Sequence, residues 1–146
     1  WVEFTASCRL LPQLAMARDS GQLSRSDAER LDHILHRLDH FIPRHPDVSL
    51  LHGDLWSGNA LSMEGGEVAV IDPACACGDA WFDIGMMRLF GGFPEACFDA
   101  WREGQGDREQ CSERIDVAQL YHLLNHVNLF GSSYVGQVRS VVERLA

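Results

Sequence analysis

Apolar residues recur with helical spacing along most of this chain, and they predict a protein built mainly of helices. The clearest stripe covers residues 31–42, where apolar side chains return every three or four positions. Ser26 and Glu29 have the spacing of a capping box and predict the start of this helix, which Pro43 ends. The apolar-rich segment before Ala17 is also expected to be helical.

The second half of the chain continues this helical pattern with less amphipathic segments. Residues 79–90 and 113–130 are apolar almost all round, which predicts two buried helices. Shorter helices are expected over residues 94–103 and 133–145, with a polar loop at residues 104–108.

Between these helical segments, three short runs have strand character. Residues 48–51 predict one strand, and residues 60–63 and 67–71 predict a β-hairpin whose tight turn is formed by Gly65 and Gly66. The fold class expected from all these elements is α+β, mostly helical, with one small hairpin.

The hairpin has a consequence for two polar residues at its open end. A two-residue loop at Gly65 and Gly66 places Asn59 directly opposite Asp72, at about 4.5–5.5 Å. Pro73 biases the preceding Asp72 toward extended backbone, which would keep it in strand geometry. The hairpin is therefore expected to bring these two oxygen-bearing side chains together.

This pair belongs to a larger pattern that is typical of phosphoryl transfer. Asp54 follows His52-Gly53 and precedes Asn59 by five positions, and Asp72 ends the next apolar run. Kinases use one carboxylate to accept the proton of the attacking hydroxyl, and an Asn and an Asp to hold magnesium. The pattern predicts Asp54 as the general base and Asn59 and Asp72 as magnesium ligands, although a plain strand-to-strand loop with an Asn–Asp hydrogen bond remains the alternative.

Other polar residues are expected to support this loop or to bind the substrate. His52, Asp79 and Asp83 are interpreted as orienting the loop. Trp56, two residues after the base, either stacks on a sugar ring or packs under the loop. His126 shares one helix face with His122 and Asn125; that face forms a hydrogen-bond network or lines the cleft, and the cleft is favoured for His126.

Composition and charge limit the other classes of function. The chain has 146 residues, the size of one domain, and its net charge of −9 argues against binding to nucleic acid or to an anionic membrane surface. No apolar run approaches the roughly 20 residues of a membrane span. Five irregularly spaced Cys predict no disulfide framework and favour a cytoplasmic protein.

The basic residues suggest that part of a kinase is missing from this chain. All 12 are Arg, whereas protein kinases place a Lys from an upstream strand on the nucleotide phosphates. The chain also begins at Trp1 rather than at Met. Residues 1–146 are therefore expected to be the C-terminal catalytic lobe of a kinase-like fold, without the N-terminal nucleotide-clamping lobe.

Several motifs together resemble the fructosamine kinase family. A His-Gly-Asp motif with an Asn five residues after its Asp also fits aminoglycoside phosphotransferases and choline kinases, so the flanking segments carry the distinction. These segments are His52-Gly-Asp-Leu-Trp-Ser-Gly-Asn59, Ile71-Asp-Pro-Ala74, Gly78-Asp79, Asp83, Leu89-Phe-Gly-Gly-Phe-Pro94 and Leu124-Asn-His-Val-Asn-Leu-Phe-Gly131.

The resemblance implies a function as well as a fold. It implies the C-terminal lobe of an aminoglycoside phosphotransferase-like fold, with Mg²⁺ and ATP, that phosphorylates the sugar C3 hydroxyl of fructosamines or ribulosamines and so leads to deglycation. The partners implied are ATP, a ketoamine on a small amine or a protein lysine, and the N-terminal lobe of the same protein. The alternatives are a phosphotransferase for aminoglycosides or amino-alcohols and a non-catalytic remnant.

Overall fold

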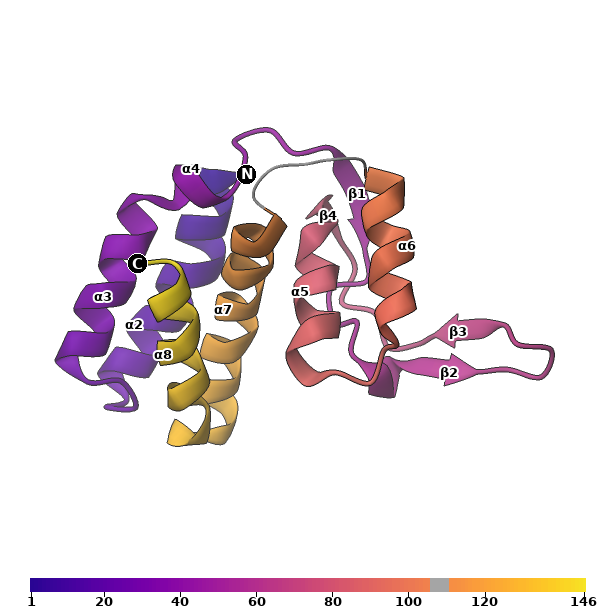
Figure 1. Cartoon of the computed structure of the whole chain (residues 1–146). Helices are drawn as coiled ribbons and strands as arrows, with labels where there is room; N and C mark the ends of the chain where they lie inside the picture. The colour runs from indigo at the N-terminus through magenta and orange to yellow at the C-terminus, as the bar shows by residue number, and fades with distance from the viewer. Residues whose placement is uncertain (106–110) are drawn as a thin grey trace.

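Two groups of helices lie side by side in the computed structural model, which describes residues 1–105 and 111–146 (Figure 1). Helix α5 packs along α7 and joins the two groups. The second group consists of α5 (Trp81–Phe90) and α6 (Glu95–Gln105), which lie beside the strands. The first group consists of α2 (Leu11–Asp19), α3 (Arg25–His36), α4 (Leu38–Phe41), α7 (Cys111–Phe130) and α8 (Val135–Arg144).

The helix at the start of the chain changes its winding before it reaches α2. A short α1 (Val2–Phe4) leads into a π-helical segment, η1 (Thr5–Leu10), and then into α2. Pro12 occupies the first turn of α2 and has no backbone N–H, so the regular α-helical hydrogen bonding is interrupted at this junction. Residues of η1 are consequently rotated relative to a continuous α-helix.

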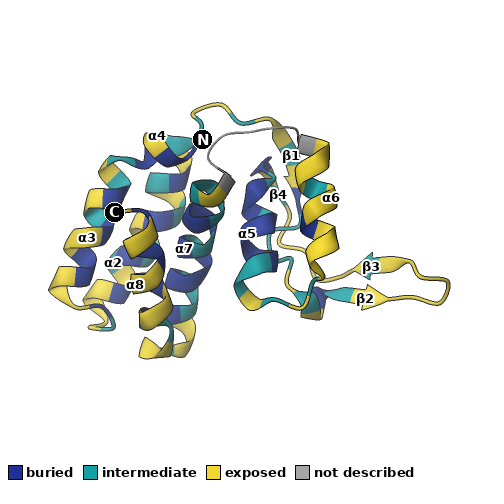
Figure 2. Ribbon diagram, viewed as in Figure 1, coloured by how far each residue is buried: buried dark blue, intermediate teal, exposed yellow. Residues whose placement is uncertain are grey.

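The main core lies between the helices of the first group, and the dark blue faces in Figure 2 mark it. The apolar stripe predicted over residues 31–42 points into this core, although the helix is broken at Arg37 into α3 and α4. Side chains with almost no exposed surface include Leu10, Leu31, Leu38, Leu120, Leu123, Leu124, Val127, Val138 and Leu145.

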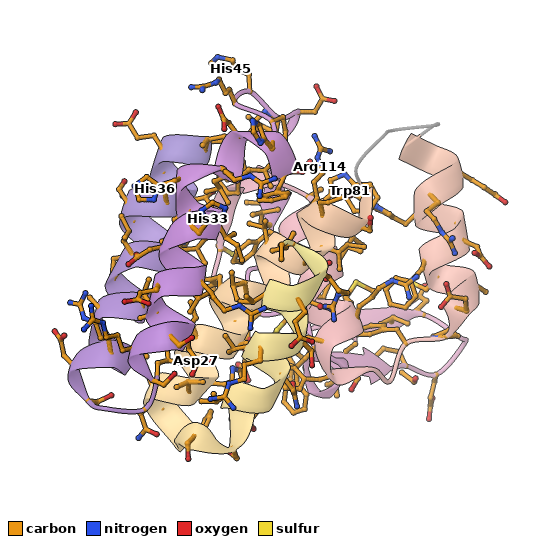
Figure 3. The ribbon with its side chains drawn as sticks, turned by 60° about the vertical axis from the view of Figure 1, so that its left-hand side comes forward. Asp27, His33, His36, His45, Trp81 and Arg114 are labelled. Atoms are coloured by element: carbon orange, nitrogen blue, oxygen red, sulfur yellow. The ribbon has the colours of Figure 1, made fainter. Side chains whose placement is uncertain are left out.

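The start of α3 differs from the prediction. Ser24, not Ser26, is the N-cap, and its side chain accepts the backbone N–H of Asp27 at 3.1 Å. Asp27 in turn accepts the backbone N–H of Ser24 at 3.2 Å, so the capping box begins two residues earlier. Asp27 also accepts two hydrogen bonds from Arg139 of α8, and it lies near the lower end of α3 in Figure 3.

The strands form two separate pairs rather than one sheet. The predicted strand β1 (Val48–Leu51) is confirmed, and it pairs antiparallel with β4 (Ala76–Asp79), which the sequence did not predict. The small residues of β4 show no alternation of apolar and polar positions, so only the pairing with β1 identifies it. Strands β2 (Ala60–Ser62) and β3 (Val68–Val70) form the predicted hairpin, which projects from the body (Figure 1).

The remaining boundaries differ from the prediction by a few residues. Helix α5 begins at Trp81, and α7 begins at Cys111. A 3-10 turn, η3 (Ser132–Tyr134), precedes α8. Helix α6 continues to Gln105, and most of the loop predicted at residues 104–108 lies outside the described residues. A mostly helical α+β fold is confirmed, and no helix in the described ranges has the length and apolar character to cross a bilayer.

Candidate active site

The loop that carries Asp54 begins where β1 ends, and a carboxylate from α5 anchors it. Asp83 accepts the backbone N–H of His52 at 2.7 Å with one oxygen and the backbone N–H of Gly53 at 2.8 Å with the other. A carboxylate that accepts two backbone hydrogen bonds holds the chain firmly, because both of its oxygens are satisfied. The structure thus brings Asp83 to the loop that it was expected to orient.

Gly53 is the point of closest approach between this loop and the segment before β4. Its φ is +81°, in the region that side chains disfavour. A Cβ at this position would lie 2.2 Å from the carbonyl oxygen of Ala74. The loop can therefore pass Ala74 only because residue 53 has no side chain.

His52 connects the base to the end of the hairpin. Its Nδ1 accepts the backbone N–H of Asp54 at 3.3 Å, so in the neutral ring Nε2 carries the proton and donates to the carbonyl of Ile71 at 2.9 Å. The imidazole therefore bridges Asp54 and the residue directly before Asp72.

Asn59 lies against Asp54. It belongs to the 3-10 turn η2 (Ser57–Asn59) and is buried, and its amide nitrogen donates to the Asp54 carbonyl at 2.9 Å and to Oδ2 of Asp54 at 3.2 Å. Because the nitrogen faces Asp54, the amide oxygen is the atom of Asn59 that a cation would contact.

The register of the hairpin is shifted by one residue from the prediction. Ala60 pairs with Val70, and the backbone N–H of Ile71 donates to the carbonyl of Asn59 at 3.0 Å, so Asn59 lies opposite Ile71 and not Asp72. The cause is the turn, which closes between Met63 and Glu67 and leaves three residues in the loop instead of two.

Asp72 also differs in backbone conformation. Its φ is +51°, the left-handed region, whereas an extended conformation was expected before Pro73. The proline disfavours the right-handed helical region for its neighbour, and Asp is one of the few residues with a side chain that tolerates the left-handed one. Asp72 is exposed, and the described residues contain no group of three or more His, Cys, Asp or Glu placed to hold a metal ion.

Asp79 lies at the end of β4 and not inside the helix where it was expected. Its carboxylate accepts the backbone N–H of Trp81 at 3.3 Å and lies 3.8 Å from Nε of Arg114 in α7. These contacts hold the start of α5 against α7. Asp79 therefore supports the helix that carries Asp83.

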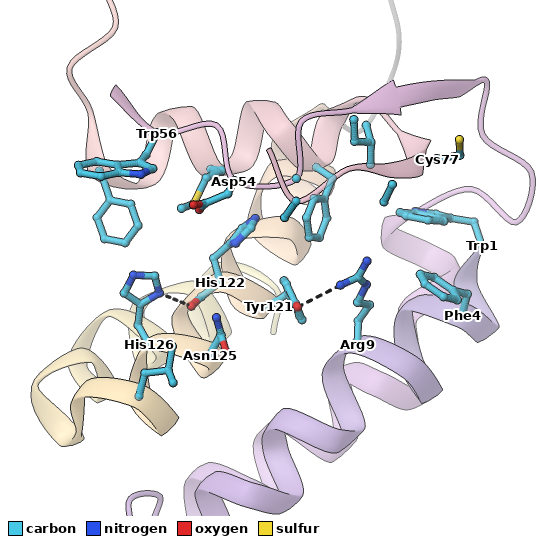
Figure 4. A pocket seen from close by; sticks show the side chains of 18 of the residues that line it. Trp1, Phe4, Arg9, Asp54, Trp56, Cys77, Tyr121, His122, Asn125 and His126 are labelled. Carbon is cyan, nitrogen blue, oxygen red and sulfur yellow. Dashed lines mark hydrogen bonds between the residues drawn. The ribbon is translucent and has the colours of Figure 1, made fainter. Parts of the chain in front are cut away.

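A cavity of about 500 Å³ opens beside Asp54, between the loop and α7 (Figure 4). Its volume lies within the range of roughly 300–1,000 Å³ that small-molecule sites have. Trp56 lines it, is 41% exposed, and lies close over Gly58. His126 lines the opposite side, where its Nδ1 donates to the His122 carbonyl at 2.8 Å.

Sequence reasoning did not single out Arg9, which also lines the cavity. Arg9 donates a hydrogen bond to the hydroxyl of Tyr121 at 3.1 Å (Figure 4). No sequence signal connects Arg9 with Asp54, because the two belong to elements that only the fold brings together.

His122 lies in the same wall and is almost fully buried. Its pKa is lowered to about 3, mainly by burial and to a smaller extent by the nearby His126 and Arg9, against a backbone hydrogen bond at Phe82 that raises it. The ring is therefore neutral at physiological pH, and its Nε2 has no hydrogen-bond partner among the described residues.

Sequence comparisons find known proteins that are similar to this chain. A family model described as fructosamine kinase matches residues 1–146. The chain is 36% identical over 144 residues to the probable ketoamine kinase slr1563 of Synechocystis sp., covering 99% of this chain and 48% of that protein. It is 37% identical over 147 residues to the chloroplastic protein-ribulosamine 3-kinase of Arabidopsis thaliana, covering 98% of this chain and 44% of that protein.

Comparison of the structure also finds a similar protein named as a fructosamine kinase. The crystal structure of a proposed fructosamine-3-kinase from Thermobifida fusca matches with a TM-score of 0.90 at 36% identity. The match covers 99% of this chain and 50% of that one. The chain thus spans about half the length of the relatives that it matches.

Proposed function

We propose, because this chain belongs to the fructosamine kinase family, that the protein containing it transfers a phosphoryl group from ATP to the C3 hydroxyl of sugar ketoamines, either fructosamines or ribulosamines. The observation that carries the proposal is Asp54, held by Asn59 and His52 on the wall of a cavity large enough for such a substrate. Breakdown of the phosphorylated adduct would release the amine, so the reaction would lead to deglycation.

In this proposal Asp54 is the general base. Its carboxylate accepts the proton of the C3 hydroxyl as that oxygen attacks the γ-phosphorus, and the bond between the γ-phosphorus and the ADP oxygen breaks. The hydrogen bond from Asn59 fixes the direction of one carboxylate oxygen, and the other remains for the hydroxyl. The sugar phosphate and ADP are the two products.

Magnesium would be held by Asn59 and Asp72, whose oxygens are the hard ligands this ion prefers. Both residues fit this role chemically, since the amide oxygen of Asn59 faces away from its contact with Asp54, and the Asp72 carboxylate is exposed. When bound, the ion would neutralise the phosphate charge of ATP. The His52 bridge to Ile71 keeps the segment next to Asp72 at a constant position relative to the base.

The substrate would lie in the cavity between Trp56 and His126. The exposed indole of Trp56 offers a flat apolar face to a sugar ring. His126 is held by ring contacts with Phe90 at 4.8 Å and Tyr134 at 5.1 Å, and its Nε2 remains for a sugar hydroxyl. His52, Asp79 and Asp83 would keep the loop in place without touching the substrate.

We also propose that residues 1–146 act as the C-terminal catalytic lobe of a longer kinase-like protein. Two observations support this proposal. The chain matches about half the length of its relatives, and its sequence contains no Lys. An N-terminal lobe of the same protein would bind the nucleotide phosphates. The free thiols of Cys8, Cys75, Cys77 and Cys97 support a reducing, cytoplasmic setting.

Phosphorus NMR of the full-length protein with Mg-ATP and a ribulosamine tests the proposed function. A new sugar-phosphate signal is expected, and it should be absent with Asp54→Asn, whose side chain keeps the shape but not the basicity of the carboxylate. If the ketoamine gives no signal and an aminoglycoside is phosphorylated instead, the substrate class is aminoglycosides and not ketoamines. A folded protein that binds no nucleotide would point to a non-catalytic remnant.

A further inference from the structure

The cavity beside Asp54 contains a guanidinium group with no acidic partner in the part of the chain that the structure describes. Arg9 forms one hydrogen bond, to the hydroxyl of Tyr121, and no ion pair with a described carboxylate. An Arg side chain has five N–H donors, and one that serves only the fold usually directs most of them at carboxylates or carbonyls. Most donors of Arg9 thus remain for a ligand.

Aromatic rings hold this guanidinium in a defined position. Its Cζ lies 5.2 Å from the ring centre of Tyr121, 5.4 Å from that of Phe4 and 5.8 Å from that of Phe82. Arg9 belongs to the π-helical segment η1, which sets the direction of its side chain, and such segments are frequent at functional sites. A guanidinium held between rings loses little entropy when it binds an anion.

The position of Arg9 relative to the base defines two ends of the cavity. In the view of Figure 4, Tyr121 and His122 lie between Arg9 and Asp54. The charge of Arg9 is felt across this space, because it contributes to the low pKa of His122. Because no described carboxylate pairs with it, the guanidinium presents an unneutralised positive charge at this end of the cavity.

We propose that Arg9 binds a carboxylate on the amine part of the ketoamine, so that the site selects ketoamines of amino acids over those of uncharged amines. The inference rests on the proposed function, which places the sugar C3 hydroxyl at Asp54. The amine part then extends from the sugar toward the Arg9 end of the cavity. The flat guanidinium fork donates two parallel hydrogen bonds to a carboxylate, a geometry that a neutral amide cannot match.

Two substrates that differ only in this group test the proposal. The full-length protein is assayed with N-fructosylglycine and with N-fructosylglycinamide, and the binding of each is also measured by calorimetry without ATP. We expect kcat/KM and affinity to favour the glycine adduct by on the order of 10- to 100-fold, the effect of a charge-assisted hydrogen bond.

Variants then assign this preference to Arg9. Arg9→Gln is expected to lower the ratio of the two kcat/KM values to near one, mainly by raising KM for the glycine adduct. Arg9→Lys should keep part of the preference, because it retains the charge but loses the fork. Arg37→Gln is the matched control, since Arg37 also stacks on a ring, Phe41 at 5.7 Å, but lies outside the cavity.

Each contrary result has a distinct meaning. Equal kcat/KM values in the unmodified protein overturn the carboxylate site without any variant. If Arg9→Gln lowers kcat/KM equally for both substrates, the role of Arg9 is structural and the proposal fails. If the variant instead raises KM for ATP, Arg9 binds a nucleotide phosphate and not the carboxylate. If neither ketoamine is phosphorylated, the proposed function fails, and the calorimetric ratio still decides whether Arg9 binds the carboxylate.

Discussion

At the scale of single residues, the position of Asp54 depends on neighbours that bind the backbone. Asp83 anchors the two residues before it, and His52 ties it to the end of β3 through Ile71. Gly53 has no side chain, and this allows the loop to lie against Ala74. The geometry of the base is therefore sensitive to changes that leave every charged group in place.

Gly53→Ala tests this sensitivity. The new Cβ would lie 2.2 Å from the Ala74 carbonyl oxygen, so the loop must move, and a shift of ~1 Å can lower kcat by about 100-fold. Gly21→Ala is the control, because Gly21 has a similar φ of +72° but open space around it. It should cost only the backbone strain, about 1–2 kcal/mol, and leave kcat unchanged. Equal kcat values for both variants would contradict the proposed contact.

His122 gives a prediction about pH. Its pKa in the folded protein is about 3, below its ordinary value of 6.5, so the unfolded chain binds the proton first as the pH falls. Its contribution to stability is complete above pH 6.5 and declines below it, by about 2 kcal/mol between pH 7 and pH 5. Urea unfolding at both pH values should show a smaller decline for His122→Gln. His36→Gln, at an exposed position, is the control and should show the same decline in stability as the unmodified protein. Equal declines in the unmodified protein and both variants would exclude His122 as the cause.

At the scale of elements, α3 is tied to α8 by Asp27, which also belongs to the capping box at the start of α3. Asp27 receives the backbone N–H of Ser24 and two hydrogen bonds from Arg139, at 2.8 and 2.9 Å. These bonds hold the pKa of Asp27 well below its usual range, with the Arg139 hydrogen bond as the largest cause. One carboxylate thus fixes both the start of a helix and its packing partner.

Asp27→Asn should lower the free energy of unfolding by about 1–3 kcal/mol at pH 7, because it removes the charge that accepts the two hydrogen bonds of Arg139. Because the folded pKa is depressed, the carboxylate stabilises the protein above its ordinary pKa of about 4, and this contribution declines as the pH falls toward the folded value. The difference between variant and unmodified protein, measured by urea unfolding, should therefore shrink from pH 7 to pH 3. Asp19→Asn, at an exposed ion pair with Arg18, should change stability little at either pH. A difference that stays constant with pH would contradict the role of the charge.

At the scale of the whole molecule, the strands next to the site leave apolar surface uncovered. Val48 and Leu50 of β1 are 72% and 78% exposed, and Val68 and Val70 of β3 are 66% and 57% exposed. The hairpin also projects away from the helices (Figure 2). A longer protein, such as the relatives of which this chain spans about half, could cover these strands with its other half.

Under the two-lobe proposal, the 146 residues alone are expected to bind ATP weakly and to turn over little or none of it, because such a kinase uses a Lys on the nucleotide phosphates and this sequence contains no Lys. Release of ADP, followed in a coupled assay beside the full-length protein, measures this. Circular dichroism of the same sample shows whether the chain is folded. Turnover by a folded isolated chain at the rate of the full protein would refute the two-lobe proposal.

The sequence by itself determined the mostly helical fold, the strand at residues 48–51 and the residues of the loop around Asp54. These features follow from local periodicity and from a motif of close spacing, which neighbouring residues carry without reference to the rest of the fold. The family followed from the same motifs, because their flanking residues are also local.

Only the tertiary structure decided the register of the hairpin, strand β4 and the place of Arg9. The register depended on whether the turn held two residues or three, and a slip of one residue changed the partner of Asn59. Strand β4 exists because β1 pairs with it, and Arg9 reaches the cavity because α7 packs against the first helices. Contacts between segments far apart in the chain leave no periodic signal, so the cavity end opposite Asp54 could not be predicted from the sequence.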